Sequence, residues 1–209
     1  TLTVVEDTCM GEDQLDLIVN PLPNINITPI GPFCANAMPQ ALSATPFGGT
    51  WGGAATGNVF NPVTNGPGIH TVTYTYTDNN NCSKTESLDI EVYELPEVVI
   101  DPDPAEFCDN EGSVLLTATG SNGAGGYSFM WNTPSGTGTD NTYDATLSGQ
   151  HFITVTDDNG CTSTAVTVVM SHPNPTVEIL DPGPLCGSDD YFAMNATPPG
   201  GYWDGAIIS

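Results

Sequence analysis

Positive charge is almost missing from this sequence of 209 residues, in which Lys84 is the one basic residue beside 25 Asp and Glu. The formal net charge is −24. Nucleic acids and anionic membrane surfaces are normally bound through clustered Lys and Arg, which neutralise phosphates. The sequence therefore excludes the usual electrostatic route to either partner. We expect no nucleic-acid partner and no direct membrane insertion, and cations are the natural small partners.

Long apolar runs and catalytic motifs are missing as well. No window reaches the roughly 18 apolar residues of a membrane span, and Thr1 does not begin a signal peptide, so an exported protein would appear here as mature chain. There is no Gly-x-Ser-x-Gly motif, and neither Lys nor a helix follows the Gly-rich residues 120–126. His70 and His151 hold equivalent places in a repeat and do not predict a catalytic pair. We expect no enzymatic activity.

Short strands and turns account for most of what is present. Charged residues make up 12% of the chain, about half the usual share, and Thr, Asn, Ser and Gly supply the polarity. Runs of about five residues with period-two alternation are separated by Gly, Asn, Asp and Pro; residues 114–120, 127–133 and 151–157 are the clearest. This pattern is typical of antiparallel β-sandwiches. No segment has a helical period, so the sequence predicts an all-β fold.

The chain also repeats itself. A Pro, a β-branched strand, a Pro-rich bend and a Cys open each unit, and a strand, an Asp/Asn turn, a Cys and a second strand close it. The opening half recurs at residues 22–34, 95–108 and 174–186, and the closing half at 2–19, 72–92 and 152–169. Residues 42–53 align with 194–205 without a gap. We predict two complete modules, 24–96 and 97–175, joined by Pro-rich linkers, with the C-terminal part of a module at 1–23 and the N-terminal part of another at 176–209.

Cysteines recur with the modules, one before the second strand and one in the last hairpin. Their spacing favours disulfides within modules, Cys34 with Cys82 and Cys108 with Cys161, and leaves Cys9 and Cys186 unpaired in this chain. A zinc site would need paired Cys-x-x-Cys or Cys/His clusters, which are missing. Each bridge would contribute roughly 4 kcal/mol and would indicate an oxidising, extracellular setting. The alternative is a cytosolic protein with buried thiols.

Three tryptophans, Trp51, Trp131 and Trp203, each lie on the third strand of a module. A large ring there can fill the space between two sheets, so we predict core aromatics. The alternative is carbohydrate stacking, which the Gly-rich surroundings of Trp51 favour slightly.

Acidic residues suggest a calcium site. If Cys108 and Cys161 were bonded, the acids after Cys108 would approach those of the last hairpin, and further acids lie at the module junction. The candidates are Asp101, Asp103, Asp109, Glu111, Asp157 and Asp158. Hard oxygen ligands suit Ca²⁺, but Asp and Asn are also ordinary turn residues. Both interpretations stay open, and no other cofactor is expected.

The residues from 127 to 169, "YSFMWNT…LSGQHFITVTDDNGCTSTAVTVV", resemble polycystic-kidney-disease-type (PKD-like) and related immunoglobulin-like repeats of large secreted surface proteins. They are especially similar to those of SprB-like gliding adhesins and other type IX secreted proteins of Bacteroidota. In the first complete module the match is weaker, because Trp51 lies in "GGTWGG" and the turn reads "DNNNC". The resemblance implies tandem immunoglobulin-like sandwiches at a cell surface.

These observations predict an acidic, extracellular structural or adhesive repeat region. It would form an extended rod or filament on the surface of a bacterium, for adhesion or gliding. Its partners would be neighbouring modules of one long polypeptide or like subunits, together with surface glycans. The alternative function is a carbohydrate-binding accessory module of a secreted enzyme.

The two partial modules carry an expectation of their own. Residues 1–23 and 176–209 together are shorter than one module, and each would leave a sheet edge open, so neither should fold alone. Two explanations stay open. The sequence is a window on a longer polypeptide, or separate subunits of a polymer complement one another.

Overall fold

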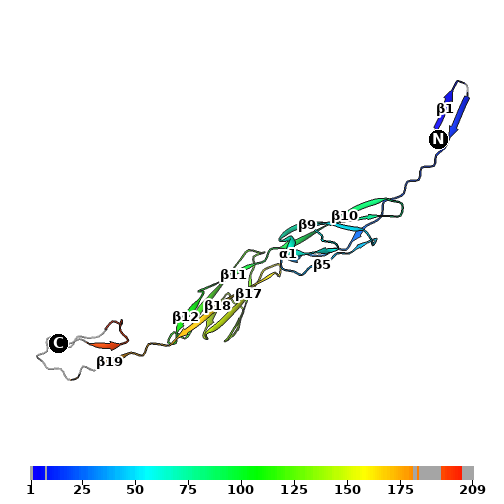
Figure 1. Ribbon diagram of the computed structural model, residues 1–209. Helices are drawn as coiled ribbons and strands as arrows, with labels where there is room; N and C mark the ends of the chain where they lie inside the picture. Colours follow the sequence, from blue (N-terminus) through cyan, green and yellow to red (C-terminus); the bar gives the residue numbers. More distant parts are fainter. Residues whose placement is uncertain (1, 8, 181–182, 184–193, 204–209) are drawn as a thin grey trace. The chain divides into compact units, whose positions relative to one another are not determined.

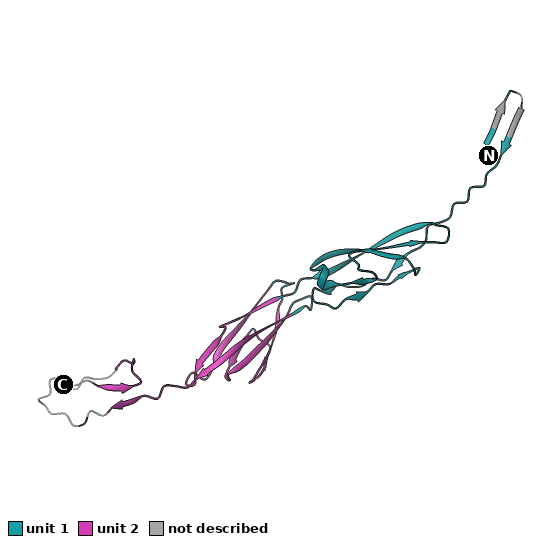
Figure 2. Cartoon of the chain, in the orientation of Figure 1, with its two compact units in different colours: residues 1–96, 122–126, 157–162 teal, residues 97–121, 127–156, 163–209 magenta. Residues whose placement is uncertain are grey.

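The computed structural model describes residues 2–7, 9–180, 183 and 194–203, and for residues 4–6 and 9–11 it describes the backbone alone. The chain divides into two units (Figure 2). Unit 1 comprises residues 1–96, 122–126 and 157–162, and unit 2 comprises residues 97–121, 127–156 and 163–209. Strands dominate both units, and the single described helix, α1 (Pro62–Asn65), is one turn long. The expected all-β class is confirmed. No helix in the described part is long and apolar enough to cross a membrane.

Unit 1 begins with a hairpin of β1 (Leu2–Glu6) and β2 (Cys9–Asp13), in which Glu6 lies opposite Cys9. The stretch after it is apolar and exposed. Leu15 and Leu17 are 85% and 83% exposed, although the same repeat positions in the first complete module are Leu88 and the buried Ile90. The apolar side chains that follow the hairpin are therefore exposed and are not part of a core.

The sandwich of unit 1 has a four-stranded sheet opposite two short strand pairs (Figure 1). The sheet has the order β4 (Phe33–Cys34), β10 (Ser83–Tyr93), β9 (Gly68–Thr77) and β7 (Thr50–Gly53). The pairs are β3 (Asn26–Ile27) with β6 (Ala44–Thr45) and β5 (Gln40–Ala41) with β8 (Val59–Phe60). Alternate residues of β9 and β10, among them Val72, Ile90 and Val92, pack with Leu42 and Phe60 in the core. The period-two pattern thus places one face of each strand in the interior.

Unit 2 has a three-stranded and a five-stranded sheet. The first has the order β11 (Glu97–Asp101), β13 (Val114–Ser121) and β16 (Thr142–Ala145). The second has the order β12 (Ala105–Cys108), β18 (Thr162–His172), β17 (Gly149–Thr156), β14 (Ser128–Thr133) and β15 (Gly136–Gly138). This arrangement is that of an immunoglobulin-like sandwich. Trp131 of β14 and Leu116 of β13 meet in its core.

Later in the sequence, β19 (Glu178–Leu180) pairs with β20 (Asn195–Thr197) in a two-stranded sheet. The main break between the units falls between Pro96 and Glu97, which is also the boundary predicted between modules 24–96 and 97–175. Two loops of the second predicted module, residues 122–126 and 157–162, are nevertheless grouped with unit 1. The division of the chain into two complete and two partial modules stays a prediction.

Candidate functional site

A disulfide joins Cys34 to Cys161, across a sequence separation of 127 residues. Among the described side chains Cys82 and Cys108 are free thiols, Cys82 partly buried and Cys108 exposed. Both predicted pairings, Cys34 with Cys82 and Cys108 with Cys161, are therefore wrong. Cys186 lies outside the described residues, and the side chain of Cys9 is not described. That these two cysteines are unpaired in this chain therefore stays a prediction.

Strand direction explains why a bridge within one module cannot form. Cys34 ends β4, which runs parallel to β10 and lies opposite Tyr93, the last residue of β10. Cys82 directly precedes β10, whose 11 residues span about 33 Å. A disulfide needs Cα atoms within about 7 Å. Cys108 and Cys161 lie at opposite ends of β18 in the same way. The parallel pairing of β4 with β10, and of β12 with β18, places the two cysteines of a module far apart. The spacing of the cysteines in the sequence does not show this pairing.

The bonded Cys161 belongs to a tight turn organised by Asp157. The carboxylate of Asp157, which is 5% exposed, accepts hydrogen bonds from the backbone N–H groups of Asn159 (3.0 Å), Cys161 (2.8 Å) and Ala124 (3.1 Å). The N–H of Asp157 in turn donates to the carbonyl of Cys161 (3.0 Å). Asp157 therefore fixes the position of Cys161 and holds the 122–126 loop against the turn.

Glycine is required where this loop meets the turn. Gly123 has φ +63°, and a Cβ there would lie 2.5 Å from Asp157 Oδ2 and 3.1 Å from the backbone N of Pro96. Gly125 has a comparable φ of +75°, but nothing lies within 4 Å of its Cβ position. Both glycines thus have a positive φ, and they differ only in the space that a Cβ atom would find.

We therefore expect Gly123→Ala to destabilise unit 1 by about 2 kcal/mol more than Gly125→Ala. Both substitutions place a side chain at a residue with positive φ, which is strained. Only Gly123→Ala also displaces a buried carboxylate, that of Asp157, which accepts three hydrogen bonds. Urea denaturation of the two variants measures the difference. Equal losses of stability would show that the loop is not packed on Asp157.

The calcium candidates are not brought together. Asp157 is occupied by backbone donors, Glu111 Oε2 accepts from the N–H of Cys108 (2.8 Å), and Asp103 Oδ1 accepts from Thr167 Oγ1 (2.7 Å). Within the described residues, no group of three or more His, Cys, Asp or Glu could hold a metal ion. The predicted approach of Asp109 to Asp158 assumed the wrong disulfide, and Asp101 stays on β11. These acids thus act in turns and strand ends in this structure.

The three tryptophans lie in different surroundings. Trp131 is 0% exposed, its Nε1–H donates to the carbonyl of Asp140 (3.0 Å), and its ring lies 5.7 Å from that of Tyr143. Trp51 is partly buried, with its ring 4.8 Å from that of Tyr74. Trp203 is 50% exposed. The structure thus places Trp131 and Trp51 in cores, while Trp203 lies at the wall of a hollow.

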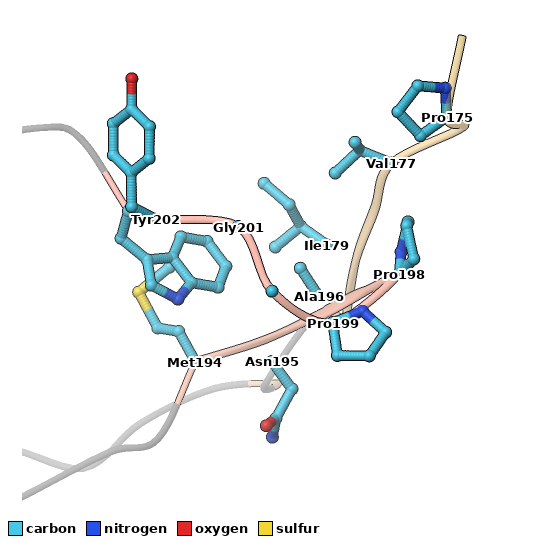
Figure 3. Close-up of a pocket in the computed structure, with 12 residues that line it drawn as sticks. Pro175, Val177, Ile179, Met194, Asn195, Ala196, Pro198, Pro199, Gly201 and Tyr202 are labelled. Carbon is cyan, nitrogen blue, oxygen red and sulfur yellow. The ribbon is translucent and has the colours of Figure 1, made fainter. Parts of the chain in front are cut away.

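That hollow, of about 570 Å³, is lined by residues from 175–179 and 194–203 (Figure 3). The side chains around it are mainly apolar and include Val177, Ile179, Met194, Ala196, Tyr202 and Trp203. In the repeat, Met194, Ala196 and Trp203 correspond to Leu42, Ala44 and Trp51, which pack in the first complete module. The hollow is therefore lined like half of a sandwich core.

The two repeat histidines lie in different surroundings. His70 is partly buried, with Nε2 2.8 Å from the carbonyl of Gly66. His151 is fully buried beside Tyr143. Its Nδ1 lies 3.2 Å from the carbonyl of Gly149, and its Nε2 has no hydrogen-bond partner. Repeat equivalence in sequence therefore did not predict equivalent surroundings.

An orphaned buried nitrogen costs about 1–3 kcal/mol. We expect His151→Leu to change the free energy of unfolding by less than about 1 kcal/mol. Leu fills a similar volume, and removal of the orphaned Nε2 offsets loss of the contact between Nδ1 and the carbonyl of Gly149. His70→Leu, which removes the contact to Gly66, should lower it by about 1 kcal/mol. Thermal or urea denaturation of both variants tests this, and a large loss in His151→Leu would reveal an unrecognised partner of Nε2.

No family model and no curated protein matches the sequence. Solved structures similar to the chain include extracellular domains 3–5 of Drosophila OTK, at 13% identity and a TM-score of 0.38, covering 72% of this chain and 63% of that one. The four N-terminal Ig domains of Dscam1 isoform 9.44 match at 9% identity and a TM-score of 0.32, covering 71% and 45%.

A Ca²⁺-stabilised adhesin that helps an Antarctic bacterium to reach out and bind ice matches at 12% identity and a TM-score of 0.36, covering 77% of this chain and 52% of that one. The chain thus spans less than two thirds of these three structures. At such TM-scores the likenesses assign no function, and the tandem immunoglobulin-like fold rests on the strand pairing described above. The resemblance to gliding adhesins stays a prediction.

Proposed function

We propose that this chain is a load-bearing length of an extracellular stalk on a bacterial surface, where tandem sandwiches hold an adhesive element away from the cell. The observation that carries the proposal is the bond between Cys34 and Cys161. In the repeat, these residues belong to the opening of one module and the closing turn of the next. A covalent bond between successive modules lets tension bypass the polypeptide between them, which an enzyme or a ligand-binding domain does not need.

The setting follows from the same chemistry. Disulfides persist in oxidising compartments, which supports an extracellular location. A net charge of −24 favours solubility at a surface and works against collapse of neighbouring stalks on each other. Export by the type IX route, a role in gliding or adhesion, and origin in Bacteroidota are parts of this proposal that the repeat pattern supports.

Neighbouring modules are the proposed partners. The exposed Leu15 and Leu17 occupy repeat positions that are covered in residues 24–96, and the hollow near Trp203 has the lining of an open core. Both surfaces suit strands of a further module, on the same polypeptide or on a like subunit.

A force experiment tests the load-bearing role. When the oxidised chain is stretched from its two ends, the bond should keep the segment between Cys34 and Cys161 from extending. The two cysteines are 127 positions apart in the sequence, which corresponds to about 44 nm of extended chain. Reduction, or Cys34→Ala, should release that length. Optical-tweezer extension curves measure it. An oxidised chain that lengthens as far as the reduced one, at the same force, would contradict the proposal.

Glycan binding is the second candidate, and one observation favours it. Tyr202 is 91% exposed beside the half-exposed Trp203, and aromatic rings at a surface can stack on sugars. A glycan array with the unaltered chain and a Tyr202→Ala/Trp203→Ala variant distinguishes the candidates. If the unaltered chain binds glycans and the double variant does not, the result would support an accessory carbohydrate-binding module. If neither binds any glycan, the result would favour the stalk.

A further inference from the structure

Cys34 and Cys108 occupy the same structural position. Cys34 lies opposite Tyr93 in the parallel pairing of β4 with β10, and the N–H of Ala35 donates to the carbonyl of Tyr93 (2.9 Å). Cys108 lies opposite His172 in the parallel pairing of β12 with β18, and the N–H of Asp109 donates to the carbonyl of His172 (2.9 Å). We call both strand-end cysteines.

Cys82 and Cys161 also share one position. The N–H of Cys82 donates to Asp78 Oδ1 (2.9 Å), as does that of Asn80 (2.8 Å), and the N–H of Asp78 donates to the carbonyl of Cys82 (3.0 Å). Asp157 and Cys161 make the same contacts. Even the left-handed residue before the cysteine recurs, as Asn81 with φ 63° and Gly160 with φ 78°. We call Cys82 and Cys161 turn cysteines.

The one bond in the described residues joins a strand-end cysteine to the turn cysteine of the next module along the sequence. We propose that every such pair in the repeat bonds by the same rule, so that Cys108 and Cys82 are attachment sites for further modules. Cys108 takes a turn cysteine, and Cys82 takes a strand-end cysteine. This inference rests on the proposed stalk and names its covalent partner as another module of the same repeat.

The state of the two thiols fits this assignment. Cys108 is exposed, whereas its bonded counterpart Cys34 is partly buried. Cys82 is partly buried, whereas its bonded counterpart Cys161 is buried. Neither can bond within its own module, because the intervening strand separates the two positions by about 33 Å. The same rule that occupies Cys34 and Cys161 therefore leaves one cysteine of each module open to a neighbour.

A second copy of this chain offers both kinds of partner. In the sequence repeat Cys9 holds the turn position and Cys186 holds the strand-end position. Cys9 begins β2, opposite Glu6, whereas Cys82 directly precedes β10. Bond formation needs a disulfide oxidant such as oxidised glutathione. One thiolate attacks it to form a mixed disulfide, the second thiolate displaces glutathione, and two protons and two electrons leave as two reduced glutathione molecules.

The test incubates the whole chain with oxidised and reduced glutathione, traps free thiols, and maps intermolecular disulfides by mass spectrometry. We expect covalent oligomers in which Cys108 is joined to Cys9 and Cys82 to Cys186. Cys9→Ser should abolish the bonds of Cys108 and spare those of Cys82, and Cys186→Ser should do the reverse.

Two results would overturn the inference. Oligomers linked mainly through Cys108 to Cys108 would show that it is only an exposed thiol, and a chain that stays monomeric with Cys34 bonded to Cys161 would show that the rule does not extend. In both cases the proposed stalk survives. If the same map lacks the bond between Cys34 and Cys161, the proposed function fails as well.

Discussion

Loss of the bond between Cys34 and Cys161 should lower the free energy of complete unfolding by about 5 kcal/mol. A bridge that closes 127 residues removes a large part of the conformational entropy of the unfolded chain, and the chain-entropy relation gives a value of this size. Cys34→Ala, Cys161→Ala and the double variant should lose nearly the same amount, because each removes the same bond. Urea denaturation in oxidising buffer measures the losses.

Cys108→Ala is the matched control for this prediction. Its thiol is free and exposed, so its substitution should change stability by less than about 0.5 kcal/mol. A loss in Cys82→Ala as large as that in Cys34→Ala would instead indicate a bridge within the first module.

Trp131→Ala should have the second largest effect, a loss of about 3–5 kcal/mol. The ring is fully buried between the sheets of unit 2, and its removal leaves both a cavity and the carbonyl of Asp140 without its donor. The same substitution at the other two tryptophans should cause smaller losses of stability. Trp51→Ala should cost less because its ring is partly open, and Trp203→Ala should cost under about 0.5 kcal/mol in this chain.

Denaturation followed by circular dichroism compares the three variants without depending on tryptophan fluorescence. A loss in Trp203→Ala equal to that in Trp131→Ala would show that residues 194–203 lie in a closed core. The described exposure of Trp203 would then be wrong.

Local sequence predicted the fold well because the signals are local. Alternation along residues 151–157 fixes which side chains of β17 face the core, and the Asp157 to Cys161 spacing predicts the turn, since an Asp side chain caps the N–H groups that follow it. Trp131 was predicted as a core residue because a large ring in a strand of a sandwich has few other places to lie.

The disulfide between Cys34 and Cys161 was harder to predict from the sequence, because it depends on the direction of the paired strands. Nothing in the spacing of Cys34 and Cys82 shows that β4 runs parallel to β10, and this direction is what separates the two sulfurs. Part of the calcium prediction rested on the same assumption, because the assumed bond of Cys108 was what brought Asp109 and Glu111 near the acids of the last hairpin. The burial of His151, compared with that of His70, likewise depends on the neighbours that pack on each ring.

The bond between Cys34 and Cys161 is tested most directly by mapping disulfides in the soluble monomer. Free thiols are first alkylated, and the chain is then cleaved at its acidic residues, because Asp78 separates Cys34 from Cys82 and Asp109 separates Cys108 from Cys161. We expect a peptide pair that joins Cys34 to Cys161, with Cys82 and Cys108 alkylated. Peptide pairs that join Cys34 to Cys82, or Cys108 to Cys161, would contradict it.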